Sequence, residues 1–150
     1  MSNKILLPTA YLAPISYYAI LLKSDCQIEQ YEHFIKQSIR NRCEIYGSNG
    51  KIRLTIPINR QGSSKTTINQ IKISYKEEWQ KNHWKTIVSA YNSSPFFKYY
   101  KDELKPFFLK KETYLISLNN KLQKTILQLL KLEARYGYTK QYNHFGQFND

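Results

Sequence analysis

The chain has 150 residues and carries 23 Lys and Arg against 11 Asp and Glu, a formal net charge of +12. This length supports one domain with a hydrophobic core, and a hydrophobic share of 41% is too high for a disordered protein. Five Gly and five Pro exclude a collagen-like or low-complexity chain. Because the basic excess is spread over both halves of the chain, it favours anionic partners in general and no single kind.

The N-terminal segment predicts a strand and then a helix. Residues Ile5 to Leu7 form a short buried strand, and Pro14 can begin the helix because its missing N–H costs nothing in a first turn. Residues at helical spacing predict the apolar face of this helix, namely Ile15, Tyr18, Ala19 and Leu22. Prolines and tyrosines interrupt the apolar run, which is far shorter than the roughly 18 residues of a spanning helix. We therefore expect no transmembrane segment, no signal peptide and a cytoplasmic protein.

The middle of the chain predicts a β-hairpin at about 42–57. Asn49-Gly50 is typical of a type I′ turn, whose two central positions both need positive φ. That turn places Ile45 opposite Leu54 and Cys43 opposite Ile56 on an apolar face. The other face is polar and carries Glu44, Tyr46, Arg53 and Thr55. A weaker strand prediction covers residues Cys26 to Gln30.

Further along, residues 59–67 are almost free of apolar side chains and predict a mobile surface loop. Residues Ile68, Ile71 and Ile73 indicate another strand. Ser74 and Glu77 have the spacing of a capping box, which would begin the next helix. That helix presents Trp79, His83, Trp84, Ile87, Val88 and Tyr91 on one face.

The C-terminal half predicts two more helical regions. The aromatic and basic segment 96–111 is interrupted by Pro106, and a long helix runs from about Tyr114 to Glu133, with Gly137 as its end. The aromatic segment allows three interpretations: a helix pair that buries its aromatics, a surface that stacks nucleic-acid bases, or a surface that inserts into a bilayer. The order of elements predicts one α/β or α+β domain over residues 1–150, with a small sheet packed by an N-terminal helix and C-terminal helices.

Motifs for metals and cofactors are absent from the sequence. Cys26 and Cys43 are the two cysteines, and their spacing matches no metal or redox motif. Two reduced core thiols are the favoured interpretation, and one disulfide is the alternative. The sequence contains no HExxH, no glycine-rich phosphate loop and no G-x-S-x-G. We therefore expect no metal site, and the cofactor is unknown.

One histidine and a group of arginines are the candidate functional residues. His83 is either a core histidine whose ring nitrogens are satisfied by neighbours or a general base at the edge of a pocket. If the first hairpin strand begins near Arg40, then Arg40 and Arg42 join Tyr46 and Arg53 on the polar face. Guanidinium groups there would bind phosphate or carboxylate, and the alternative is a solvated basic face.

Several short motifs, in this order, resemble the WbqC-like protein family. They are Tyr11 with Tyr17-Tyr18, Asn41-Arg42-x-x-Ile45 before Asn49-Gly50, Leu54-Thr55-Ile56-Pro57, Trp79-x-x-x-His83, Ile87, Tyr91 and Ser94-Pro95-Phe96-Phe97. The segment from Trp79 to Tyr100 resembles the shorter members from Bacteroidetes-type bacteria. The resemblance covers roughly residues 5–118. The family-like positions are Tyr11, Asn41, Arg42, Trp79, His83 and Tyr91.

The resemblance implies a role in the synthesis of O-antigen and other surface polysaccharides. Such proteins have been regarded as transferases that attach glycine or another aminoacyl group to a sugar, without a settled set of catalytic residues. Many members begin with His-Gln-Pro-Asn-Tyr, whereas this chain has Leu7-Pro8-Thr9-Ala10-Tyr11. The usual C-terminal segment is also missing, so we interpret the chain as a shortened member.

These observations combine into a transferase hypothesis. Arg40, Arg42 and Arg53 would bind an anionic small molecule or a lipid-linked saccharide, with Tyr46, Tyr11 and Asn41 also in the binding site. His83 would act as the base on the acceptor hydroxyl or amine, which requires that it share a cavity with the arginines. The alternative is a non-enzymatic basic module that binds nucleic acid or an anionic glycan. A third hypothesis is a subunit whose partner supplies the missing C-terminal part.

Overall fold

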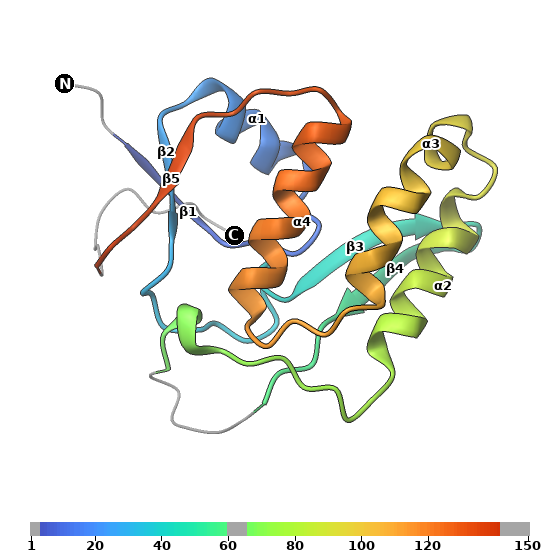
Figure 1. The fold of residues 1–150 in the computed structure, drawn as a ribbon, viewed down its shortest axis with the longest axis horizontal. Helices are drawn as coiled ribbons and strands as arrows, with labels where there is room; N and C mark the ends of the chain where they lie inside the picture. Colours follow the sequence, from blue (N-terminus) through green and yellow to red (C-terminus); the bar gives the residue numbers. More distant parts are fainter. Residues whose placement is uncertain (1–3, 60–65, 142–150) are drawn as a thin grey trace.

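The computed structural model of the chain describes residues 4–59 and 66–141. It has the predicted mixed α/β composition (Figure 1). In chain order the elements are β1 Ile5–Pro8, α1 Ile15–Lys23, β2 Cys26–Glu29, β3 Arg42–Gly47, β4 Gly50–Thr55, α2 Trp79–Tyr91, α3 Pro95–Leu104, α4 Leu115–Leu129 and β5 Tyr136–Tyr138. Two short 3-10 turns, η1 Ile68–Gln70 and η2 Lys105–Phe108, lie in the connections.

Strands β1, β2 and β5 form a parallel sheet with β2 in the centre. Helix α1 connects β1 to β2, because two parallel neighbours need a crossover rather than a tight turn. Strand β5 comes from the far end of the described chain, so the sheet joins the two ends of the domain (Figure 1). Pro8 is tolerated because β1 is an edge strand, where a missing N–H breaks no ladder.

Helix α1 buries a different face from the predicted one. Tyr17 and Leu21 are the buried residues of this helix, whereas Ile15 is 88% exposed. The Tyr17 hydroxyl donates a hydrogen bond of 2.6 Å to the carbonyl of Pro8, which ties α1 to the end of β1. The helix is apolar over most of its surface, so the position of the sheet decides which face is covered.

The β3–β4 hairpin has the predicted faces but a different register. Cys43 pairs with Leu54 and Ile45 with Ile52, so the pairing is shifted by two residues. The turn comes one residue earlier than predicted, because Gly50 has a φ of +113° while Asn49 has no positive φ. A type I′ turn needs positive φ at both positions. A shift of two residues keeps every side chain on its side, so Cys43, Ile45 and Leu54 are buried as predicted.

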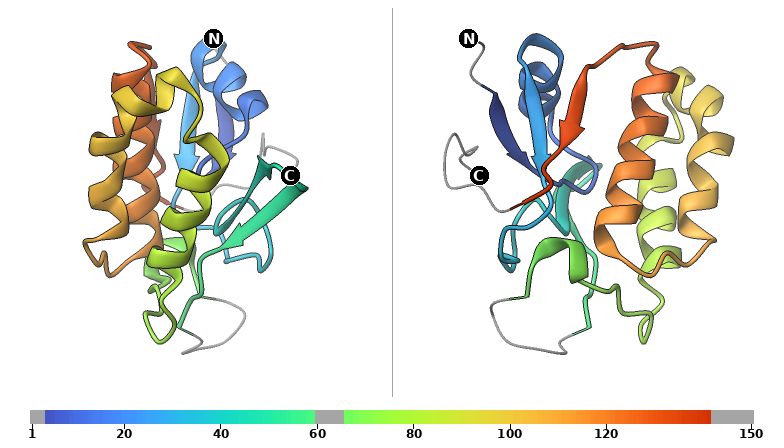
Figure 2. Two further views of the ribbon diagram at one scale, coloured as in Figure 1. Left: turned by 90° about the vertical axis from the view of Figure 1, so that its right-hand side faces the viewer. Right: turned by 60° about the vertical axis from the view of Figure 1, so that its left-hand side comes forward.

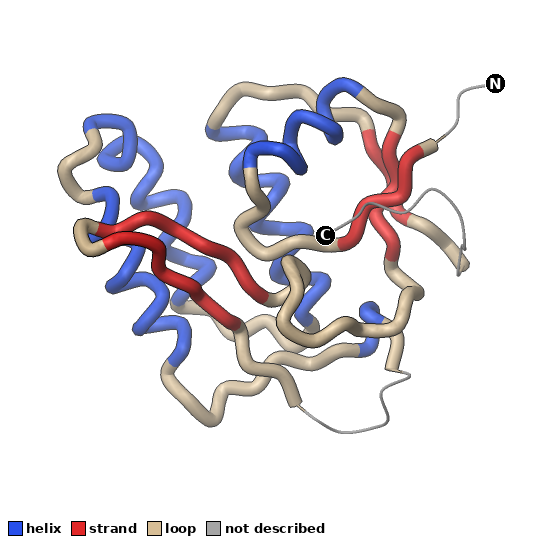
Figure 3. Tube along the Cα trace, turned by 180° about the vertical axis from the view of Figure 1, so that it is seen from behind, coloured by secondary structure: helices blue, strands red, loops and turns tan. Residues whose placement is uncertain are grey.

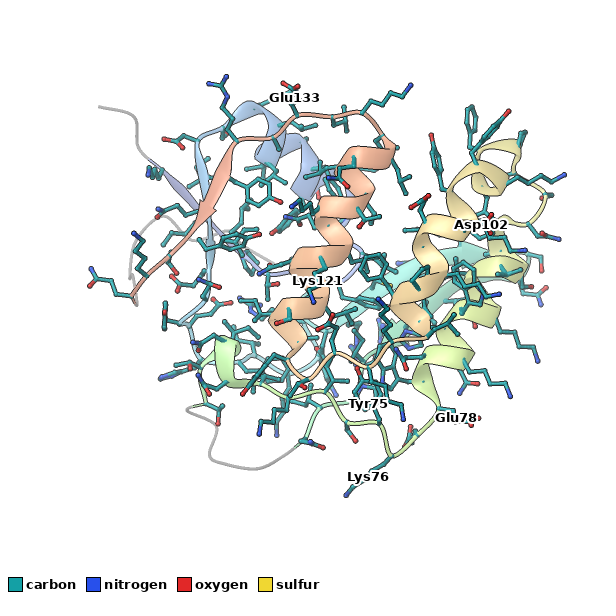
Figure 4. The ribbon with its side chains drawn as sticks, in the orientation of Figure 1. Tyr75, Lys76, Glu78, Asp102, Lys121 and Glu133 are labelled. Carbon is teal, nitrogen blue, oxygen red and sulfur yellow. The ribbon has the colours of Figure 1, made fainter. Side chains whose placement is uncertain are left out.

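The segment after the hairpin departs from the sequence prediction in two places. The predicted loop at 59–67 lies largely outside the described residues, and the isoleucines after it form η1 and single bridges instead of a strand. Ile68 and Ile73 are nevertheless buried. The predicted capping box is absent, since α2 begins at Trp79 and the Ser74 hydroxyl accepts the Lys76 N–H instead. Lys76 points away from the molecule in this turn (Figure 4).

The three later helices agree more closely with the sequence. Helix α2 buries Trp79, His83 and Ile87 as predicted, and Pro95 begins α3. Helix α4 lies within the predicted helix from about Tyr114 to Glu133, and it buries Leu115, Leu118 and Leu122, which share one face. It ends at Leu129, however, and Gly137 belongs to β5 rather than to the helix end.

Two hydrophobic clusters make up the core, and α4 contributes to both. The larger cluster lies among the hairpin, α2, η2 and α4, and includes Ile56 and Leu122. The smaller cluster lies between the parallel sheet and α1, and includes Tyr17 and Leu127. Figure 2 shows α4 between the sheet and the α2–α3 pair. In the view from behind the molecule, the β3–β4 hairpin lies in front of α2 and α3 (Figure 3).

Candidate functional site

A groove of about 1030 Å³ runs beside the hairpin. We call it the hairpin groove, and its walls come from residues 12–15, residues 37–39, strand β3 and the facing sides of α2, α3 and α4. These elements can be followed in Figure 1. Binding sites for small molecules usually have volumes of roughly 300–1,000 Å³. The hairpin groove is therefore large enough for a ligand of substantial size.

The hairpin supplies the charged side of the groove. Arg42, Glu44 and Arg53 line it, and the other described lining residues are uncharged. Nη2 of Arg53 donates to Oε1 of Glu44 at 3.3 Å, and the Lys51 ammonium lies 3.3 Å from the same carboxylate. These hydrogen bonds lower the pKa of Glu44, which keeps it ionised. Nε of Arg42 donates to the Thr55 hydroxyl at 3.2 Å, so this guanidinium is held in place without a described acidic partner.

The helices supply an aromatic wall opposite the hairpin. Trp84 stacks on Phe108 with ring centroids 5.4 Å apart, and it also contacts Phe97 at 6.1 Å. Tyr91 contacts Phe97 from the C-terminal end of α2. All four of these rings line the groove. The contacts between the rings hold them in defined positions, as a preformed binding surface requires.

The structure brings together three of the four residues of the predicted anion site. Arg42, Tyr46 and Arg53 line the hairpin groove, whereas Arg40 does not. Arg40 is 4% exposed and forms a bidentate ion pair with Glu32, with Nε–Oε1 at 2.6 Å and Nη2–Oε2 at 3.1 Å. The prediction that Arg40 lies on the polar hairpin face was wrong, because β3 begins only at Arg42 and the Glu32 carboxylate holds the guanidinium in the interior.

His83 lies in the interior and not on the hairpin groove. It is 5% exposed, its Nδ1 lies 2.9 Å from the Tyr11 hydroxyl, and its Nε2 lies 3.1 Å from the carbonyl oxygen of Thr55. Burial lowers the pKa of His83 to about 4, so the ring is neutral at physiological pH. The Trp79 ring packs edge-on against it at 5.0 Å.

This arrangement is the one expected of a core histidine. Both ring nitrogens have a protein partner, so neither is directed at a ligand. Tyr11 is fully buried, and its burial raises the pKa of the phenol well above the ordinary value. His83 does not line the hairpin groove, so this groove does not bring it together with Arg42 and Arg53 as the transferase hypothesis requires. The catalytic role of His83 stays a prediction.

Asn41 is also an internal residue. Its side chain is buried, and Nδ2 donates to the carbonyl of Ile56 at 2.9 Å. The backbone N–H of Ile56 in turn donates to the carbonyl of Asn41 at 2.8 Å. These two bonds extend the pairing of the hairpin beyond the ends of β3 and β4. The contacts of Asn41 thus hold the hairpin in place, and its binding role stays a prediction.

The family model described as the WbqC-like protein family matches residues 9–149, nearly the whole chain. The chain belongs to the WbqC-like family. The match continues past Leu118, where the resemblance noted in the sequence ends. No curated protein and no solved structure matches the chain. Within the described ranges, none of the helices has the length and apolar character needed to cross a membrane.

This WbqC-like protein also has two groups of buried hydrogen-bonded polar residues, together called the polar network, that the sequence motifs did not predict. Glu29 ends β2 and is 2% exposed, and its Oε1 accepts hydrogen bonds from the Thr139 hydroxyl at 2.9 Å and the Tyr31 N–H at 2.8 Å. Nδ2 of Asn119 donates to the Thr9 hydroxyl at 3.1 Å and to the Arg40 carbonyl at 2.8 Å. The network occupies the carboxyl edge of the parallel sheet, where α/β proteins commonly bind ligands.

A sequence signal for this network existed only in part. Asn119 is a polar residue one position after Leu118, within the apolar stripe of α4, and a buried amide usually has a structural or functional reason. Thr139 comes directly after β5, however, and a strand of three residues has too little pattern to be recognised. The network therefore depends on tertiary pairing that local patterns do not show.

Metal chemistry has no candidate among residues 4–59 and 66–141. In those ranges, no group of three or more His, Cys, Asp or Glu side chains is placed to hold a metal ion. Cys26 and Cys43 are both free and buried, as expected of core thiols. The hairpin groove itself is lined by guanidinium, carboxylate, hydroxyl and aromatic groups.

Proposed function

We propose that this WbqC-like protein is a transferase-like protein of surface-polysaccharide synthesis that binds its anionic substrate in the hairpin groove. One observation carries the proposal: Arg42, Tyr46 and Arg53 line the same groove, which family-like Tyr91 also lines. Family membership supports the polysaccharide part of the proposal, since a role in O-antigen synthesis is what the family resemblance implies. The arginines support the anionic part, because a guanidinium binds phosphate or carboxylate with two hydrogen bonds.

The reaction that fits this proposal is transfer of an aminoacyl group to a saccharide. A hydroxyl or amine of the saccharide attacks the acyl carbon of the donor, and a new C–O or C–N bond forms. The bond between the acyl carbon and the donor's leaving group breaks, and the proton of the nucleophile passes to that leaving group or to solvent. Arg42 and Arg53 would hold the negative charge of the bound substrate, and the aromatic wall would exclude water.

His83 has no part in this proposed binding step. To accept a proton from a substrate at Nδ1, it would have to lose its hydrogen bond to the buried Tyr11 hydroxyl. We therefore propose that Tyr11, Asn41 and His83 hold the fold beside the groove, while Arg42, Tyr46 and Arg53 contact the substrate.

The test is a search for transfer followed by groove variants. The full chain is incubated with aminoacyl donors, nucleotide sugars and lipid-linked saccharides, and products are detected as mass changes. Arg42→Gln and Arg53→Gln are expected to lower kcat/KM about tenfold or more, since each removes a charge-assisted contact. Lys51→Gln is the matched control, because Lys51 also pairs with Glu44 but does not line the groove.

Two results would reject the proposal. Transfer that continues unchanged in both arginine variants would place the reaction outside the hairpin groove. Absence of transfer, together with binding of nucleic acid or anionic glycan that weakens steeply as salt rises, would favour the non-enzymatic module.

A further inference from the structure

The hairpin groove is amphipathic across its width. Its charged residues all come from the hairpin, namely Arg42, Glu44 and Arg53. The facing walls are mostly apolar or aromatic. They include the partly exposed Ile39, Trp84, Leu104 and Ile126 and the buried Ile87, Phe97, Phe108 and Leu122. Two guanidinium groups against one carboxylate leave an excess of positive charge along one side. A ligand that fits this arrangement has a long apolar part and an anionic end.

Exposed apolar residues lie where the groove meets solvent. Ile15, at the start of α1, is 88% exposed, and Tyr46, near the end of β3, is 68% exposed. Both line the groove. They would extend the apolar contact of a ligand beyond the groove itself.

The apolar walls argue against a nucleotide or a free sugar as the main occupant. Such ligands carry hydroxyl and amide groups, which lose free energy when they leave water without hydrogen-bond partners. Among the uncharged lining residues the polar side chains are a minority, and four of them are tyrosines with large apolar rings; they are Tyr18, Gln37, Ser38, Tyr46, Tyr91, Ser94 and Tyr100. A hydrocarbon chain needs no such partners and gains free energy from every methylene that leaves water.

We propose that the hairpin groove binds a single-chain lipid phosphate, with the hydrocarbon chain against the aromatic wall and the phosphate on Arg42 and Arg53. This names the substrate class of the proposed function as the lipid-linked one, and to that extent it rests on that function. The binding itself depends only on the amphipathic groove, so it can be tested without any transfer reaction.

Trp84 provides a reporter inside the groove. The chain has two tryptophans, and Trp79 is 3% exposed and does not line the groove. The protein is titrated with monomeric decyl phosphate, with decanol and with inorganic phosphate, and tryptophan fluorescence is recorded. We expect a saturable change with decyl phosphate, a weaker one with decanol and none with phosphate alone. Trp84→Phe should remove the change, which assigns it to the groove.

Charge and volume variants separate the two parts of the ligand. Arg42→Gln with Arg53→Gln should raise the Kd for decyl phosphate about tenfold or more and leave decanol binding unchanged. Lys51→Gln should alter neither, because Lys51 lies outside the groove. Ala13→Phe places a ring in the groove wall and should weaken binding of both amphiphiles, as measured by calorimetry on protein whose circular dichroism is unchanged.

Each contrary result has a defined meaning. Equal responses to decyl phosphate and inorganic phosphate, or no effect of the double arginine variant, would overturn the lipid-phosphate proposal. Binding only to anionic vesicles, without a response to monomeric decyl phosphate, would indicate a bilayer surface and would also overturn it. Binding of decyl phosphate without any transfer would leave this inference intact and reject the proposed function. If transfer occurs and decyl phosphate does not inhibit it, the proposed function stands and the lipid-phosphate inference is rejected.

Discussion

The Tyr11 hydroxyl donates a hydrogen bond of 2.9 Å to Nδ1 of His83, across 72 positions of sequence. The direction of this bond is set by the other ring nitrogen. Nε2 lies 3.1 Å from the carbonyl oxygen of Thr55, which can only accept, so Nε2 carries the proton and Nδ1 is the acceptor. The neutral ring thus joins the segment after β1, helix α2 and the end of β4.

We predict that His83 acts mainly on stability. His83→Ala should lower the free energy of unfolding by about 3 kcal/mol, because it leaves the buried Tyr11 hydroxyl without a partner and creates a cavity. His83→Gln should lower the free energy of unfolding by less, since the glutamine amide can still donate a hydrogen bond to the Thr55 carbonyl. Urea unfolding measures both, with exposed Lys85→Ala on the same helix as the control. Normal stability combined with complete loss of transfer in His83→Gln would instead support a catalytic base.

The depressed pKa of His83 predicts a pH dependence of stability. The ring titrates near 4 in the folded chain and near the ordinary value of 6.5 when unfolded, so the unfolded state binds the proton more readily. Stability should therefore be full above about pH 7.5 and fall by about 2 kcal/mol on going to about pH 5. Urea unfolding at the two pH values measures this. In His83→Gln the loss over this interval should be smaller by the same amount, and an equal loss in both proteins would refute the assignment.

Substitution of the two arginines Arg40 and Arg42 should change the free energy of unfolding by very different amounts. Arg40→Gln leaves the Glu32 carboxylate, which is 12% exposed, without its bidentate partner, and should cost about 3 kcal/mol or more of stability. Arg42→Gln should change stability by less than about 1 kcal/mol, because its contact with Thr55 is exposed. Thermal or urea unfolding measures the difference. Equal stability losses would show that Arg40 is not a structural residue.

Both cysteines should be unreactive in the folded protein. Burial raises the pKa of Cys43 to about 12, and burial together with nearby Asp25 raises the pKa of Cys26. Since the thiolate is the reactive form, a chromogenic disulfide reagent near neutral pH should label neither thiol until denaturant is added. Two thiols should then react. Rapid labelling of either cysteine in the native protein would contradict its place in the core.

Local periodicity explains which predictions of the fold were confirmed. Alternation in the hairpin and the helical spacing of α2 and α4 identify residues that share a face, and those faces are buried. The prediction of the buried face of α1 was wrong, because this helix has apolar side chains on two faces. The sequence pattern therefore does not predict whether Tyr17 or Tyr18 is buried. Packing of α1 against the sheet determines that Tyr17 is the buried residue.

For the candidate site, the sequence identified residue types better than places. Arg42, Tyr46 and Arg53 were predicted to share a face, which follows from the period of two in a strand. All three line the hairpin groove, but so do Cys43 and Ile45 of the other face, so the period alone does not explain the lining. Arg40 has the same parity as Arg42, yet it precedes the strand, so the alternation does not extend to it. Its partner Glu32 lies in a segment without regular structure, for which no periodic rule applies.

Short-range pattern was enough for the sequence by itself to determine that the helices form, which residues share each face of the hairpin, and the resemblance to the WbqC-like family. Only the tertiary structure decided the hairpin register, the pairing of β5 with β2, the ion pair of Arg40 and the sealed position of His83. The physical reason is that each of these depends on a partner distant along the chain. Such contacts are determined by which residues the folded core brings close together, and local sequence patterns do not show this.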